Sequence, residues 1–143
     1  MTDTHELIEN ARRDVLLGDY VSALTVLSEL LRVRPDNVDA LLLKGNALEV
    51  QAYAESNVDD MSFENCPLLS EAKACYEMIL ARAPGNAEAL RDLANLHKDA
   101  GHLEKAMNLL HRALSAHEHR KPQGAEALLG IKSEIEELKR LIG

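Results

Sequence analysis

The chain has 143 residues, of which 46% are hydrophobic and 28% are charged, as expected for a single globular domain over residues 1–143. Its formal net charge of -8 argues against nucleic acid as a partner, because phosphate binding depends on Lys and Arg. No run of 18 apolar residues is present, so we predict no membrane insertion, and the polar, acidic N-terminal stretch favours a cytoplasmic protein.

The first predicted unit, residues 4–37, is a pair of helices joined by a short turn. Apolar residues such as Leu7 and Ala11 recur at helical spacing up to a turn at Gly18. A second apolar run follows and ends at Pro35, a residue that cannot continue a helix. Helix, turn and helix therefore follow one another within this unit.

The second predicted unit, residues 38–86, follows the same scheme but is 15 residues longer. The extra residues fall near 53–67, with the sequence YAESNVDDMSFENCP. They form either a solvated loop or an extension of the unit's first helix followed by a loop. A more specific hypothesis is that Met61 and Phe63 dock, into the protein's own groove or onto a partner.

The third predicted unit, residues 87–120, has Asn86 as its candidate N-cap and Gly101 at its turn. A further helix is predicted at about 124–142, with apolar residues spaced three and four apart. We expect it to cap the repeats, and the alternative is a coiled-coil contact with a second copy. The oligomeric state is accordingly a monomer or a possible homodimer. The apolar stripe consists of Leu128, Ile131, Ile135, Leu138 and Ile142.

The three units share one register. Ala23, Ala72 and Ala106 lie 49 and 34 residues apart, and Pro35 and Pro84 are also 49 apart. A repeat of about 34 residues is typical of stacked helix-turn-helix units. The sequence therefore predicts an all-α repeat solenoid of about seven helices.

At these positions the chain resembles the tetratricopeptide repeat family. The first helix of each repeat carries a large apolar residue and, four positions later, a small one, and the second carries an Ala, a bulky residue and a closing Pro. The corresponding residues are Leu7, Leu41 and Leu90; Ala11, Gly45 and Ala94; Ala23, Ala72 and Ala106; Leu27, Tyr76 and Leu110; and Pro35 and Pro84. The resemblance covers about residues 4–120. It departs from the family pattern at Glu118, where Pro is expected, so we expect the sixth helix to run longer.

The resemblance implies that the first helices line a concave groove for a protein or peptide partner. Amide side chains in such a groove could hydrogen-bond both the donors and the acceptors of an extended peptide backbone. Each could equally be a solvated polar residue. The predicted groove residues are Arg12, Asn46, Glu49, Arg91, Asn95 and Lys98.

A version of the family that binds chaperone C-terminal tails uses a clamp of Lys, Arg and Asn residues. The clamp is absent here, so this activity is rejected. The corresponding positions hold Ile8 and Arg12, Leu43, and Glu88 and Asp92. No pattern of catalytic, metal-binding or cofactor-binding residues is evident, and His117 and His119 would point to different faces of a helix. We therefore expect a non-enzymatic adaptor or scaffold without metal or cofactor. The alternatives are a small acidic secretion-type chaperone of three-repeat architecture and a structural homo-oligomer.

Overall fold

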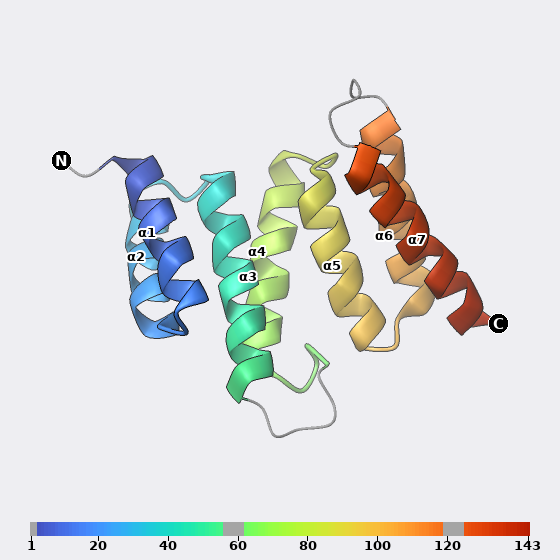
Figure 1. The fold of residues 1–143 in the computed structure, drawn as a ribbon, viewed down its shortest axis with the longest axis horizontal. Coiled ribbons are helices and arrows are strands. Elements are labelled where there is room, and N and C mark those ends of the chain that lie inside the picture. Colours follow the sequence, from blue (N-terminus) through green and yellow to red (C-terminus); the bar gives the residue numbers. More distant parts are fainter. Residues whose placement is uncertain (1–2, 56–61, 119–124) are drawn as a thin grey trace.

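The protein is an array of helices. The computed structural model describes residues 3–55, 62–118 and 125–143, and within these ranges it contains seven helices and no strand (Figure 1). The predicted all-α repeat fold is confirmed. The helices are α1 (Thr4–Leu16), α2 (Tyr20–Val33), α3 (Val38–Glu55), α4 (Pro67–Arg82), α5 (Ala87–Asp99), α6 (Leu103–Glu118) and α7 (Ala125–Ile142).

Side-chain caps and two glycines set where several helices begin and end. Asn37 and Asn86 each accept a hydrogen bond through Oδ1 from the backbone N–H three residues later, at 2.9 and 3.0 Å. These bonds satisfy donors that the first helical turn leaves unpaired. Gly18 and Gly101 have φ angles of 82° and 85°, a region that favours glycine, and they form the tight turns after α1 and α5.

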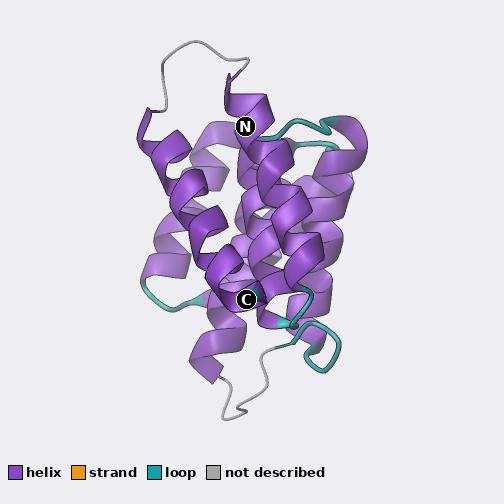
Figure 2. Ribbon diagram, turned by 90° about the vertical axis from the view of Figure 1, so that its right-hand side faces the viewer, coloured by secondary structure: helices purple, strands orange, loops and turns teal. Residues whose placement is uncertain are grey.

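The odd-numbered helices form one layer and the even-numbered helices lie behind them (Figure 1). Successive helices run in opposite directions (Figure 1), and the view along the array shows the helices joined by loops at both ends (Figure 2). Each helix packs on its neighbours in sequence, and α1 also touches α3. Of the described helices, none is long and apolar enough to cross a membrane.

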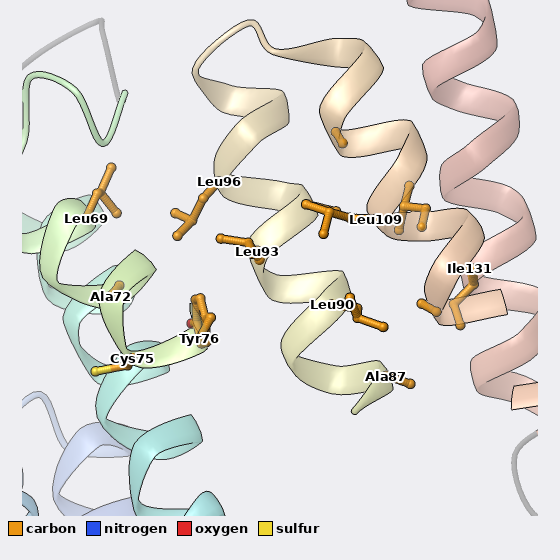
Figure 3. Packing of buried hydrophobic residues seen from close by; sticks show 14 of the residues in the cluster. Leu69, Ala72, Cys75, Tyr76, Ala87, Leu90, Leu93, Leu96, Leu109 and Ile131 are labelled. Carbon is orange, nitrogen blue, oxygen red and sulfur yellow. The ribbon is translucent and has the colours of Figure 1, made fainter. Parts of the chain in front are cut away.

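Small residues allow the paired helices to approach closely. Ala23, Ala72 and Ala106 are completely buried. The closest fit is at Gly45 of α3, where an added Cβ would lie 2.5 Å from Cε1 of the buried Tyr76. Larger apolar residues fill the space between neighbouring helices. Leu69 of α4, for example, faces Leu96 of α5 (Figure 3).

Helix α7 packs against α6 and buries most of its predicted apolar stripe. Ile131, Ile135 and Leu138 are at most 4% exposed. Leu128 is half-buried and Ile142, the last helical residue, is 47% exposed. The stripe is therefore buried along the middle of the helix and exposed at its end.

The extra residues of the second unit fall partly in a longer helix. α3 has 18 residues, whereas α1 and α5 have 13 each. It runs through Glu55, and the chain is described again from Ser62, so Met61 lies outside the described residues. Of the two structural alternatives, the extended first helix is the one observed.

Candidate functional site

A polar cavity of about 330 Å³ opens among α3, α5 and α7. These three helices belong to the same layer of the array (Figure 1). The cavity brings together two amides, three carboxylates and one guanidinium. Its lining residues are Asn46, Glu88, Arg91, Asp92, Asn95 and Glu134.

Tyr76 reaches this region from the helix behind it. Its hydroxyl group lies 3.1 Å from Oδ1 of Asn46 and also forms a hydrogen bond with Oε2 of Glu49. Burial raises the pKa of Glu49 to about 7, the Tyr76 hydrogen bond opposes that rise, and the nearby charge of Asp92 adds to it. The half-buried Asn46 and Glu49 are thus fixed by an internal tyrosine.

Asp92 of α5 lies in a similar environment. Burial raises its pKa to about 6, and the carboxylates of Glu88 and Glu134 raise it further, while Arg91 and a hydrogen bond with Asn46 act in the opposite direction. Carboxyl groups from α3 and α5 are therefore held close together and partly out of water.

The basic residues near the cavity are engaged by α7. Arg91 forms an ion pair with Glu134, and Nζ of Lys98 lies 3.8 Å from Oε1 of Glu137. Both cations therefore fasten α7 to the edge of α5. A ligand in the cavity would meet cations that already have anionic partners.

The structure brings some of the predicted groove residues together and leaves others apart. Asn46, Arg91 and Asn95 line the cavity, whereas Arg12 does not line it and pairs with Glu9 of its own helix at 3.4 Å.

Glu49 and Lys98 lie next to the cavity lining. Glu49 forms a hydrogen bond with Tyr76, which also contacts Asn46, and Lys98 pairs with Glu137 of α7. The sequence did not predict Glu134, because α7 lies outside the repeats and so has no groove register. The sequence places Asp92 only at a position of the absent clamp, whereas in the structure it lines the cavity.

Phe63 lies against its own chain and not in the groove. Its ring packs edge-to-face on the ring of His97, with 5.1 Å between ring centroids, and Nζ of Lys73 lies 5.1 Å from the same ring centre. Its surroundings are thus α4, α5 and the turn before α6. These contacts within the chain account for the partial burial of Phe63 without docking into the groove or onto a partner.

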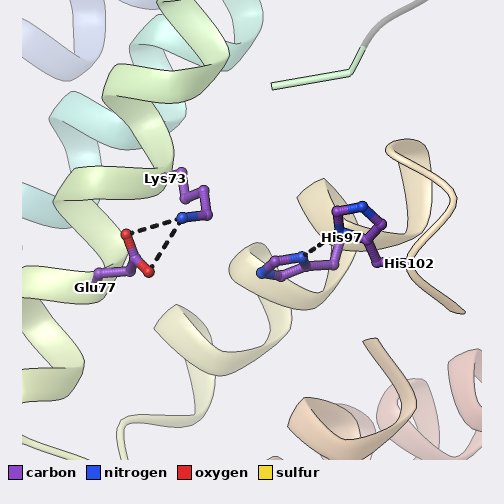
Figure 4. A network of polar contacts seen from close by, with 4 residues as sticks. All are labelled: Lys73, Glu77, His97 and His102. Atoms are coloured by element: carbon purple, nitrogen blue, oxygen red, sulfur yellow. Dashed lines mark hydrogen bonds and ion pairs between the residues drawn. The ribbon is translucent and has the colours of Figure 1, made fainter. Parts of the chain in front are cut away.

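A pair of histidines beside Phe63 was missed by the sequence analysis. Nδ1 of His97 and Nδ1 of His102 are 3.2 Å apart, close to the Lys73–Glu77 ion pair of α4 (Figure 4). Burial lowers the pKa of His97 to about 4, and the positive charge of Lys105 and His102 contributes. His97 is 2% exposed, so it serves as a neutral core residue.

Among the described residues, no group of three or more His, Cys, Asp and Glu side chains could hold a metal ion. This holds for the histidine pair and for the acidic cavity.

Comparison with known proteins identifies the repeat. Residues 69–130 match the family model described as tetratricopeptide repeat. Over these residues the chain is similar to tetratricopeptide repeats. This family typically forms non-enzymatic protein-interaction modules, and the matched region includes the α5 wall of the cavity and the beginning of α7.

One solved structure similar to this chain is entitled "MamA RS-1 ArsTM double mutant". It is 21% identical, and the match covers 98% of this chain and 97% of that chain with a TM-score of 0.31. The comparison with curated proteins finds no match.

Proposed function

We propose that the protein is a non-enzymatic adaptor that binds a segment of another protein along the layer formed by α1, α3, α5 and α7. The observation that carries this proposal is the polar cavity, which gathers Asn46, Asn95 and Asp92 from two helices of that layer. Its volume of about 330 Å³ is within the range of about 300–1,000 Å³ of many ligand sites.

The amides suit recognition of a peptide backbone. Asn95 is exposed and Asn46 is half-buried, so each can present polar atoms to a ligand. An amide group has both a donor and an acceptor, which allows it to pair with an extended chain without reading its sequence closely. Side chains of the partner would then determine specificity.

The same proposal divides the chain into three repeats and a cap. The repeats are residues 4–37, 38–86 and 87–120, and α7 is the capping helix because its apolar side covers α6. All seven helices then form one domain, in which the second repeat has a longer first helix. We expect this module to act in the cytoplasm.

The test is a substitution that removes groove contacts without disturbing the core. Glu88 and Asn95 line the cavity and are both exposed, so the double variant Glu88→Ala/Asn95→Ala should keep the fold. We expect it to capture a smaller amount of the partners that the parent chain retains from a cell lysate, as measured by quantitative mass spectrometry.

The matched control changes the same residue types elsewhere. Glu104 and Asn108 are exposed on α6, outside the cavity, so Glu104→Ala/Asn108→Ala alters composition and charge identically. It should capture partners as the parent does. Equal capture by the parent and both variants, all with the same melting curve, would reject the groove.

A further inference from the structure

The cavity contains more negative charge than its own cations offset. Arg91 is paired with Glu134 and Lys98 with Glu137. Within the described residues, no ion pair involves Asp92, which lines the cavity. The lining thus holds three carboxylates and a single guanidinium, that of Arg91, which Glu134 already pairs with.

Glu49 of α3 lies next to this lining, because the Tyr76 hydroxyl contacts both Glu49 and Asn46. It too forms no ion pair with a described residue, and its carboxylate is held by the hydroxyl of Tyr76. Burying a carboxylate without a cation is unfavourable, which is why burial raises the pKa values of both Glu49 and Asp92. A positive group bound between them would favour the ionised form of both.

We propose that the cavity binds a lysine or arginine side chain of the partner, with Asp92 as its main anionic contact and Glu49 as a second. This inference rests on the proposed function and specifies the partner's chemistry. Asn46 and Asn95 flank the site and would hydrogen-bond the main chain beside the cationic residue.

The shape and charge of the site favour this occupant over an acidic segment. A cavity of about 330 Å³ holds one long side chain and the backbone around it, and not a whole helix. A phosphorylated or acidic peptide would face Glu88, Asp92 and Glu134, and like charges in a partly dry site repel strongly. Arg91 offsets only part of this repulsion, because it is already paired with Glu134 and also stabilises the Asp92 carboxylate.

A peptide library provides the probe. Phage displaying random dodecapeptides are selected on the immobilised full chain, with bare support as background, and the enriched peptides are synthesised with a fluorescent label. We expect enriched sequences to contain Lys or Arg, and replacement of that residue by norleucine to weaken binding at least about tenfold. Norleucine keeps the length of the lysine side chain and removes its charge.

The protein variant tests the other side of the contact. Asp92→Asn preserves the side-chain shape and should also weaken binding at least about tenfold, while Glu104→Gln, the same charge change on exposed α6, should stay within about twofold. Combining Asp92→Asn with the norleucine peptide should cause little additional loss, because both changes remove the same ion pair. Glu49→Gln serves as a second variant if Asp92→Asn fails to fold.

The outcomes separate the two proposals. Enriched peptides without a cationic residue that still require Glu88 and Asn95 would overturn the cationic-side-chain inference and leave groove binding intact. Equal weakening by Asp92→Asn and Glu104→Gln would reduce the effect to overall charge and overturn the inference as well. If no peptide is enriched above background, the proposed function and the inference both fail.

Discussion

The two ends of the array differ in how much of their apolar surface is buried. At the C-terminal end α7 covers α6, and Ile131 and Leu138 are almost completely buried. At the N-terminal end, an apolar pocket of about 410 Å³ lies between α1 and α2 and includes Leu7, Val26 and Leu30. Four large apolar residues there are mostly exposed, namely Leu16 (82%), Leu17 (76%), Val21 (74%) and Val33 (67%).

The difference shows how a repeat array distributes its stability. In such arrays each unit gains from its own packing and from its contact with each neighbour. The core of α1 and α2, which includes Ile8 and Leu27, is completed only by Ala40 and Leu43 of α3. The large cluster instead extends from Leu48 of α3 to Leu138 of α7. The N-terminal pair should therefore be the weaker end.

The largest effect is expected from disrupting the packing of α7 at the C-terminal end. Ile135 is 4% exposed, so Ile135→Asp buries an unpaired carboxylate and should destabilise the protein by more than about 4 kcal/mol. Leu129→Asp on the same helix is the control, because Leu129 is 66% exposed and should tolerate the charge. Chemical denaturation followed by circular dichroism measures both.

Protein concentration separates capping from dimer formation in that experiment. If α7 caps its own chain, the loss caused by Ile135→Asp should be independent of protein concentration. A well-folded monomeric variant from a dimeric parent, detected by sedimentation, would contradict the capping assignment.

A smaller loss is expected where α3 and α4 touch. Gly45→Ala places a Cβ 2.5 Å from Cε1 of Tyr76, so the ring must shift, and we expect a destabilisation of about 1–3 kcal/mol. This outcome opposes the gain of about 1 kcal/mol that Ala normally gives over Gly in a helix. In Gly85→Ala the nearest atom is 3.8 Å away, so little change is expected. Comparable thermal stability of both variants would contradict the close fit.

Hydrogen exchange measures the two ends within one molecule. Backbone amides in the middle of α1 and α2 should exchange through openings at least about 1 kcal/mol easier than those in α5 and α6, because the N-terminal pair has a smaller core and one neighbour. Native-state exchange followed by mass spectrometry of peptides resolves the four helices. Equal protection across them would show that the array unfolds as one cooperative unit.

The residues that line the polar cavity could be predicted to share one layer only where the repeat register applies. That register placed Asn46, Arg91 and Asn95 on one layer, and all three line the cavity. It gave no position for Glu134, because α7 has no counterpart among the repeats. It also gave none for Phe63, because the extra residues of the second unit occur once.

The repeat register could have predicted that His97 is buried. It lies 49 residues after Leu48, in the register that also relates Ala23 to Ala72, and Leu48 is 2% exposed. The register therefore places an imidazole at a core position. Its partners could not be read from the sequence, because Phe63 reaches it from the added segment and His102 from the following turn.

His97 also makes the larger core sensitive to acid. The pKa of His97 is lowered from 6.5 to about 4 by burial, so the unfolded chain takes up the proton first as pH falls. Stability contributed by this residue is therefore complete above pH 6.5 and is lost as pH falls towards 4. His97→Gln should reduce the drop in melting temperature between these two pH values.

The control for this prediction lies at the other end of the array. His5 of α1 is exposed, so His5→Gln replaces an imidazole with the same amide outside the core. Glu49 and Asp92 titrate with the opposite sign in an overlapping range, because their folded pKa values are raised. The difference between each variant and the parent is therefore the quantity to compare. A drop as steep in His97→Gln as in the parent would remove His97 as its source.

The smallest effect is expected on the exposed apolar surface of the N-terminal pair. Leu17 and Val33 are 76% and 67% exposed, so Leu17→Gln and Val33→Gln remove little buried surface, and each should change stability by no more than about 0.5 kcal/mol. This expectation holds only if that end faces water in solution. If a second copy covered it, each substitution would weaken that contact, and the stability of the parent would rise with protein concentration while that of the variants rose less. Denaturation and sedimentation over a wide concentration range distinguish the two cases. Concentration-independent stability for the parent and both variants would mean that the uncovered end of the array is stable without a second copy, with α3 as its main packing neighbour.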